Sequence, residues 1–240
     1  GKQEGDHFYL AAVDCTGHGV PGGFMSMLGV SFLNEIMANE KDLKPGEILS
    51  RLKERVVNEL SGTQGVQAKD GMDMAMLKIP NPKSQSPKGE EVEVEFAGAQ
   101  NPLYLIREGV AEDPPVLEVY RNGEEVDEKV SKPFRDSSDG LEIQADKAGI
   151  GSEEHGVEHF RTVSFKVQKG DALYIFSDGY ADQFGGPKGK KFRYGAFKRV
   201  LTELQDRSME DQKRELGKQF EEWKGDQEQV DDVLVMGVRL

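Results

Sequence analysis

The sequence of 240 residues contains a single cysteine, so it cannot form an intrachain disulfide. No run of apolar residues approaches the roughly 20 that a membrane-spanning helix requires. The first residues also lack the pattern of a signal peptide. The scarcity of cysteine favours a reducing compartment, and we therefore expect a cytoplasmic protein. Direct membrane insertion of this segment is not expected, although a full-length chain would be membrane-tethered if a preceding N-terminal region supplied an anchor.

Basic residues are outnumbered, with 31 Lys and Arg against 44 Asp and Glu, which gives a formal charge of −13. This charge argues against a nucleic-acid or anionic-membrane partner. The length allows one large domain or two small ones, and the sequence shows no repeat, low-complexity tract or linker. We therefore expect a single domain over residues 1–240. Because Gly1 is followed almost at once by a strand-like segment, we expect this domain to be the C-terminal part of a longer chain.

Alternating and helical spacings of apolar residues predict an α+β protein. Strands are expected at residues 8–13, 72–79, 91–96, 103–107, 160–167, 171–177 and 233–238, with 91–96 and 103–107 forming a hairpin. Helices are expected at 21–39, 45–60, 194–204 and 209–224. Residues 108–160 are predicted to be a variable excursion with short strands at 116–120 and 140–143. Since few strands are joined by crossover helices, we expect sheet packed against sheet with helices outside.

Acidic residues border three of the strand-like segments. Asp14, Asp178 and Asp231 each lie at such a border and could converge at one end of a sheet. Three adjacent carboxylates repel one another unless cations lie between them, which favours two Mg²⁺ or Mn²⁺ ions that activate a water for phosphate-ester hydrolysis. The alternative is that these are ordinary turn aspartates. Asp70 is predicted in a turn, and a supporting role for Asp73 stays open.

Two rival phosphate chemistries lack required residues. Cys15 precedes glycine-rich sequence, but a cysteine phosphatase needs an arginine six positions later, where this chain has Pro21. Residues 185–191 resemble a phosphate-binding loop, yet that motif requires a glycine in place of Phe184 and a hydroxyl in place of Lys191. The lysines of this loop are therefore predicted to be solvated, with a basic loop beside a phosphate site as the alternative.

Histidine and serine chemistry is also disfavoured. One cysteine and four scattered histidines argue against a zinc site. His155 and His159 are predicted to be exposed. His18 is predicted to be structural or to support the site from behind its ligands, rather than to be catalytic. Ser26 and Ser177 have no visible His/Asp partner pattern, so neither is expected to be a nucleophile.

Five segments, in chain order, resemble the bacterial SpoIIE/RsbU branch of the PPM (PP2C-like) serine/threonine phosphatases. They are DCTGHGVPGGFMS from Asp14, DGMD from Asp70, FAGAQNPLY from Phe96, YIFSDGYADQFGG from Tyr174 and DDVLV from Asp231. The likeness extends along the whole chain and is thinnest between residues 108 and 160. The set of motifs is specific, whereas any one of them alone would be weak.

The resemblance implies a PP2C-like α-β-β-α sandwich of two antiparallel sheets flanked by helix pairs. It also implies a centre of two Mn²⁺ or Mg²⁺ ions, bridged by Asp14 and bound by the Cys15 backbone carbonyl, Asp178 and Asp231. Asp231 is chosen over Asp232 because the first residue of the pair matches the ligand position. A metal-activated water would hydrolyse phosphoserine or phosphothreonine on a partner protein in bacterial partner-switching signalling. The implied partner is a STAS-type anti-sigma-factor antagonist, and an upstream sensor domain is implied in the full-length chain.

One departure from the family concerns a further metal-associated aspartate, which relatives carry on an earlier strand. Asp6 fits that pattern superficially but lies too close to Asp14, so we predict that Asp6 is a hairpin residue. The first strand of the family fold is then expected to be lacking from this chain. This departure keeps open the alternative of a phosphoprotein-binding regulatory or pseudo-phosphatase module. A third alternative, a non-phosphatase Mg²⁺-dependent hydrolase, would act on nucleotides rather than on phosphopeptides.

Overall fold

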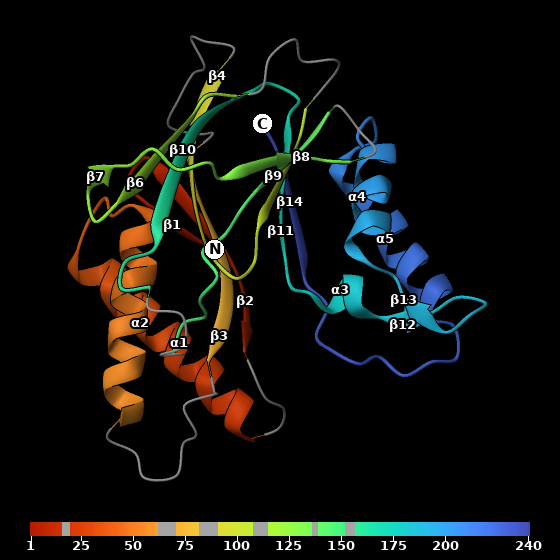
Figure 1. Ribbon diagram of the computed structural model, residues 1–240, viewed down its shortest axis with the longest axis horizontal. Helices are drawn as coiled ribbons and strands as arrows, with labels where there is room; N and C mark the ends of the chain where they lie inside the picture. The colour runs from red at the N-terminus through yellow and green to blue at the C-terminus, as the bar shows by residue number, and fades with distance from the viewer. Residues whose placement is uncertain (16–19, 62–70, 82–90, 108–114, 136–138, 152–156) are drawn as a thin grey trace.

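Two antiparallel sheets form the centre of the protein and helices cover their outer faces, as Figure 1 shows for the computed structural model. The structure describes residues 1–15, 20–61, 71–81, 91–107, 115–135, 139–151 and 157–240. The layered α+β sandwich expected from the sequence is confirmed. No helix within these ranges is long and apolar enough to cross a membrane.

The first sheet has seven strands in the order β1-β2-β3-β4-β10-β6-β7. These are β1 (Lys2–Glu4), β2 (His7–Cys15), β3 (Met72–Pro80), β4 (Glu91–Ala99), β10 (Arg161–Gln168), β6 (Leu117–Arg121) and β7 (Glu124–Glu125). β1 and β2 form a hairpin in which Glu4 lies opposite His7. Asp6 is therefore a hairpin residue, as predicted.

The second sheet has five strands in the order β14-β11-β5-β9-β8. These are β14 (Val235–Arg239), β11 (Ala172–Phe176), β5 (Leu103–Ile106), β9 (Gly140–Ile143) and β8 (Ser131–Pro133). A separate small hairpin pairs β12 (Phe184–Gly185) with β13 (Lys190–Lys191). The predicted excursion at 108–160 therefore contributes β6 and β7 to one sheet and β8 and β9 to the other.

Helix pairs cover the two outer faces. α1 (Val20–Asn39) and α2 (Pro45–Ser61) pack on the seven-stranded sheet, while α4 (Tyr194–Glu203) and α5 (Met209–Lys224) pack on the five-stranded sheet. The short α3 (Gly179–Asp182) follows β11. α5 begins where the Ser208 side chain accepts a hydrogen bond from the Asp211 backbone N–H, as an N-cap residue does.

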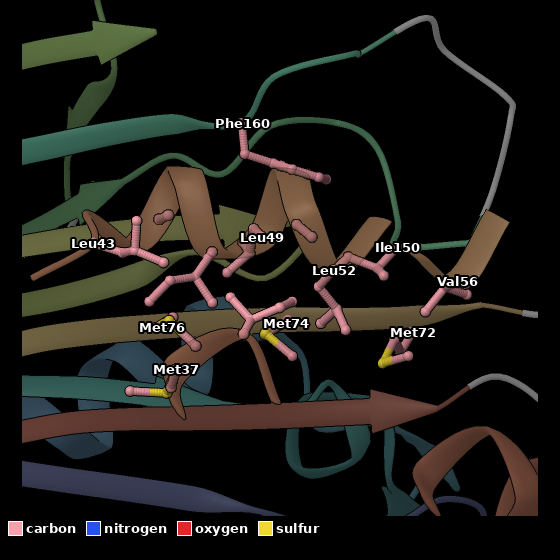
Figure 2. Packing of buried hydrophobic residues seen from close by; sticks show 14 of the residues in the cluster. Met37, Leu43, Leu49, Leu52, Val56, Met72, Met74, Met76, Ile150 and Phe160 are labelled. Carbon is pink, nitrogen blue, oxygen red and sulfur yellow. The ribbon is translucent and has the colours of Figure 1, made fainter. Parts of the chain in front are cut away.

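Three apolar layers hold the sandwich together, because side chains alternate between the two faces of each strand. Leu103 and Leu105 of β5 lie between the sheets, whereas Tyr104 and Ile106 face α4 and α5. On β3, the methionines at 72, 74 and 76 pack under the buried stripe of α2, which Figure 2 shows. Full burial of each such side chain contributes about 1.5–3 kcal/mol.

The predicted hairpin between residues 91–96 and 103–107 is wrong. β4 pairs with β3 and β10, whereas β5 pairs with β11 and β9 in the other sheet. Gln100 takes a positive φ of 65° between the two strands and donates its backbone N–H to the Asp146 backbone carbonyl. Every residue of β5 is buried, as is typical of a central strand covered on both faces. The continuously apolar sequence of β5 was therefore the signal against a half-exposed hairpin.

Candidate active site

Acidic side chains from both sheets meet at one end of the sandwich. Asp14 lies next to the end of β2, and strand pairing places it directly opposite Asp73 of β3. Asp73 is held close to the backbone at Gly149, where an added Cβ would lie 3.1 Å from the Asp73 Oδ1 atom. The predicted site residue Asp14 thus has a carboxylate neighbour, Asp73, for which the sequence left the role open.

Asp178 comes from the other sheet. It follows β11 and occupies the N-cap position of α3, where its side chain makes no capping hydrogen bond. Its Oδ1 atom is buried and has no hydrogen-bond partner among the described residues. A buried carboxylate oxygen without a donor is costly, so this oxygen is available to a cation that would occupy the site.

A third strand-end segment, residues 231–234, is fixed against Asp178 by Ser177. The Ser177 hydroxyl donates to the Asp232 carbonyl (2.8 Å) and accepts from the Leu234 backbone N–H (2.9 Å). Gly179 allows the close approach, since a Cβ at this position would lie 2.4 Å from the Asp232 carbonyl oxygen. Ser177 is therefore a positioning residue, and the structure gives no support to a nucleophilic role for it.

These carboxylates raise one another's pKa values, as closely spaced like charges do. Burial, followed by the charges of Asp178 and Asp231, raises the pKa of Asp14 to about 7. Burial and the charge of Asp178 raise the pKa of Asp73 to about 6. Burial and the charge of Asp231 also raise the pKa of Asp178. Asp231 and, more weakly, Asp232 also contribute to the raised pKa of Asp14; the choice of Asp231 from the pair stays a prediction.

A cavity of about 560 Å³ opens between these elements. Its lining includes Asp14, Cys15 and Ser177, the first turns of α1, and the segment from Gln229 to Asp232. A larger cavity of about 770 Å³ lies between α2 and β10. The lining of that cavity includes both basic and acidic side chains but none of the converging aspartates. The smaller cavity is therefore the candidate site.

The donor chemistry fits hard divalent cations, which prefer carboxylate and carbonyl oxygens. Negative charges this close favour either protonation of a carboxylate or a bound cation. The buried Asp178 Oδ1 atom, which has no hydrogen-bond partner among the described residues, favours a bound cation. No three Asp, Glu, His or Cys side chains within the described ranges are close enough to form a complete metal-binding group. The structure therefore brings the predicted residues together without closing a full ligand set around one point.

The other sequence candidates divide into three groups. His18, Asp70 and His155 lie outside the described residues. His159 is exposed, as predicted. Ser26 donates its hydroxyl to the Gly22 carbonyl within α1, which is an ordinary helical hydrogen bond.

Sequence reasoning did not find a second layer of residues around the aspartates. Asp182, one turn of α3 after Asp178, forms an ion pair with Lys191 (2.8 Å). Burial and the charges of Asp178 and Asp182 raise the pKa of Tyr194 to about 12. The sequence signal for Asp182 was its spacing of four residues from Asp178, which places the two side chains on one helix face.

Comparisons with known proteins concern the family and the fold. The family model of stage II sporulation protein E (SpoIIE) matches residues 135–240, so the resemblance seen in the motifs is confirmed there. The SiaA-PP2C domain of Pseudomonas aeruginosa shares the fold, with a TM-score of 0.73 at 20% identity, covering 100% of this chain and 78% of that one. RsbX, solved in complex with magnesium, has a TM-score of 0.53 at 16% identity, covering 98% of this chain and 82% of that one. No curated protein sequence matches the chain. The chain therefore has the PP2C-type fold.

Proposed function

We propose that this protein is a metal-dependent phosphatase that removes phosphate from phosphoserine or phosphothreonine on a partner protein. The PP2C-type fold and the SpoIIE match in the C-terminal part support this proposal. The observation that carries it is the convergence of aspartates at one end of the sandwich. Asp14 lies opposite Asp73 and shares a cavity with Asp231 and with Ser177, the neighbour of Asp178.

The residues that would hold two Mn²⁺ or Mg²⁺ ions are Asp14, Asp178, Asp231 and the Cys15 backbone carbonyl. Asp14 is central to this set, since the charges of Asp178 and Asp231 both act on it. Such cations would supply Lewis-acid chemistry, by acidifying a water and neutralising phosphate oxygens. The magnesium in RsbX supports this choice of ion. Around them, Ser177 fixes the segment that carries Asp231, and Lys191 balances the charge of Asp182.

We also propose a place in bacterial partner-switching signalling, with a STAS-type anti-sigma-factor antagonist as substrate. The single domain over residues 1–240 would then receive its signal from an upstream sensor domain and act in the cytoplasm. The support is the resemblance of the five motifs and the likeness to SiaA and RsbX.

The alternative is a regulatory or pseudo-phosphatase module that binds a phosphoprotein without hydrolysing it. The absence of a closed metal-binding group among the described side chains favours this reading. The two functions make opposite predictions about turnover.

Release of phosphate from a phosphoserine peptide, with and without Mn²⁺, tests the proposal. The comparison includes Asp178→Asn, which keeps the volume of the side chain and removes its charge. The proposal predicts turnover that requires Mn²⁺ and is lost in the variant. Binding of the peptide without turnover, in Mn²⁺ or Mg²⁺, would support the pseudo-phosphatase instead. Turnover of nucleotides alone would show that the protein is a different kind of hydrolase.

A further inference from the structure

A strongly basic surface lies beside the acidic site. Between Asp182 and Glu203 the chain has six basic residues and no acidic one, in a protein whose formal charge is −13. This segment forms the β12–β13 hairpin and α4 (Figure 1). We call the exposed part of it the basic hairpin surface, and its residues are Lys188, Lys190, Lys191 and Arg193.

Most of these charges have no ion-pair partner among the residues that the structure describes. Lys191 pairs with Asp182. Lys188, Lys190 and Arg193 form no ion pair with any described residue, although the chain carries 44 acidic residues that could have supplied one. Unpaired like charges gathered on one surface repel one another, and an anionic partner relieves that repulsion.

The basic hairpin surface is held rigidly, unlike a loose surface loop. The Gly186 N–H donates to the Trp223 carbonyl (2.7 Å), and the Trp223 indole N–H donates to the Gln183 carbonyl (3.0 Å). The backbone of the hairpin packs so tightly on α5 that a Cβ at Gly185 would lie 1.8 Å from the Trp223 carbonyl oxygen. Side chains on a pre-positioned hairpin lose less conformational freedom when they bind a partner.

The same hairpin is connected to the active site. The Gln183 side chain is fully buried, donates to the Glu228 carbonyl (2.8 Å) and accepts from the Val230 N–H (3.4 Å). These contacts fix the hairpin relative to the segment that leads into Asp231. Lys191 pairs with Asp182 (2.8 Å), whose backbone N–H donates to the Asp178 carbonyl (3.0 Å). The positive surface therefore borders the converging carboxylates.

Two aromatic side chains add apolar contact area at this border. Phe184 and Tyr194 are each 40% exposed. Phe184 lies opposite Lys191 in the hairpin, with the lysine Nζ 5.9 Å from the ring centroid. Exposed aromatic rings beside a group of basic side chains are typical of a surface that binds another protein.

We propose that the basic hairpin surface is the docking site for the phosphoprotein substrate, and that it selects substrates with acidic residues flanking the phosphorylated one. This proposal rests on the proposed function. Charge complementarity favours an acidic polypeptide, since the surface joins a site that would hold the phosphorylated residue itself. The surface thereby supplies a local attraction for an anionic protein on a molecule whose formal net charge is −13.

The test compares two fluorescently labelled peptides that share one phosphoserine and differ in having Glu and Asp or Gln and Asn around it. Binding is measured by anisotropy in EDTA, where no turnover takes place, at about 50 mM and about 500 mM NaCl. We expect the wild type to bind the acidic peptide at least tenfold more tightly at low salt, and to lose most of that preference at high salt. The double variant K188E/K190E should lose at least tenfold in affinity for the acidic peptide and much less for the neutral one.

The matched control is K166E/K169E, which makes the same change in net charge. Both of its lysines are exposed, and Lys166 lies opposite Glu93, away from the strand ends at Asp14 and Asp73. The control should keep the affinity of the wild type for both peptides. Equal losses in both double variants, or no preference of the wild type for the acidic peptide, would overturn the proposal. Equally tight binding of a single-stranded oligonucleotide that depends on Lys188 and Lys190 would overturn it too, in favour of nucleic acid.

Turnover in Mn²⁺ separates this proposal from the function on which it rests. If K188E/K190E lowers kcat/KM for the acidic peptide at least tenfold more than for the neutral peptide, docking and catalysis are both supported. If the wild type binds the acidic peptide selectively but releases no phosphate from either peptide, the proposed phosphatase activity is refuted and the proposed docking surface is supported.

Discussion

The Ser177 hydroxyl carries a specific prediction, because it connects β11 to the segment that holds Asp231. Ser177→Ala removes two hydrogen bonds, one donated to the Asp232 carbonyl and one accepted from the Leu234 N–H. Each is worth about 1 kcal/mol, and unpaired buried groups add to the cost. We expect a loss of about 2–3 kcal/mol in the free energy of unfolding. At about 2–4 °C per kcal/mol for a domain of this size, the melting temperature should fall by about 5–10 °C.

The variant should still fold, since the Ser177 backbone N–H keeps its hydrogen bond to the Leu234 carbonyl (3.0 Å). Loss of the clamp should, however, lower the affinity for Mn²⁺ by about 10–100-fold, as loss of a residue that positions a ligand does. Calorimetric titration of Mn²⁺ measures this effect, and thermal unfolding in EDTA measures the stability.

Ser50→Ala is the matched control. The Ser50 hydroxyl also makes two hydrogen bonds, donating to the Gly46 carbonyl and accepting from the Phe160 N–H, but it lies between α2 and the start of β10. It should cost similar stability and leave Mn²⁺ affinity unchanged. If Ser177→Ala were destabilised yet bound Mn²⁺ as the wild type does, the positioning role would be refuted.

Three further predictions concern the same framework. In EDTA the protein should lose stability as the pH rises from about 4 to 7, because folded Asp14, with its pKa raised from 3.8 to about 7, binds a proton that the unfolded chain has released. After allowance for solvent screening of this half-exposed group the loss is about 1–2 kcal/mol, and urea midpoints that rise with pH instead would contradict it. Gly179→Ala should weaken Mn²⁺ binding, because the added Cβ would displace the Asp232 carbonyl. Gly195→Ala in α4, where an added Cβ has open space, should leave Mn²⁺ binding unchanged. Titration calorimetry of both variants measures the difference. Leu52→Ala should cost about 2–5 kcal/mol in denaturant unfolding, since Leu52 is fully buried between α2 and the seven-stranded sheet, and a loss below 1 kcal/mol would show that this layer is loosely packed.

The sequence predicted the larger elements well where apolar periodicity is strong. The helix predicted at 209–224 agrees with α5 (Met209–Lys224), and the strand predicted at 140–143 agrees with β9 (Gly140–Ile143). The short strands β1, β7 and β8 have no such pattern, because two or three residues give no periodicity. They are strands because a neighbouring strand offers its free hydrogen-bonding edge.

Pairing between distant segments was the part that local pattern did not supply. Leu103–Ile106 follows β4 after a short turn, yet it lies in the other sheet, because the chain crosses the sandwich at Gln100 and Asn101. The candidate site shows the same limit. Asp14, Asp178 and Asp231 were selected from their positions at strand ends, whereas the role of Asp73 depends on its register opposite Asp14. Likewise, Ser177 acquires its role only through residues 55 and 57 positions away in the sequence.

The most direct test of the central claim is a calorimetric titration of Mn²⁺ into the metal-free protein at pH 7, in two buffers that differ in ionisation enthalpy. If the converging carboxylates hold the cations, two ions should bind. Their binding should release protons from the group around Asp14, so that the measured heat depends on the buffer. Asp14→Asn and Asp178→Asn should each lose binding. No binding by the wild type, or undiminished binding by both variants, would contradict the claim that this end of the sandwich is the metal centre.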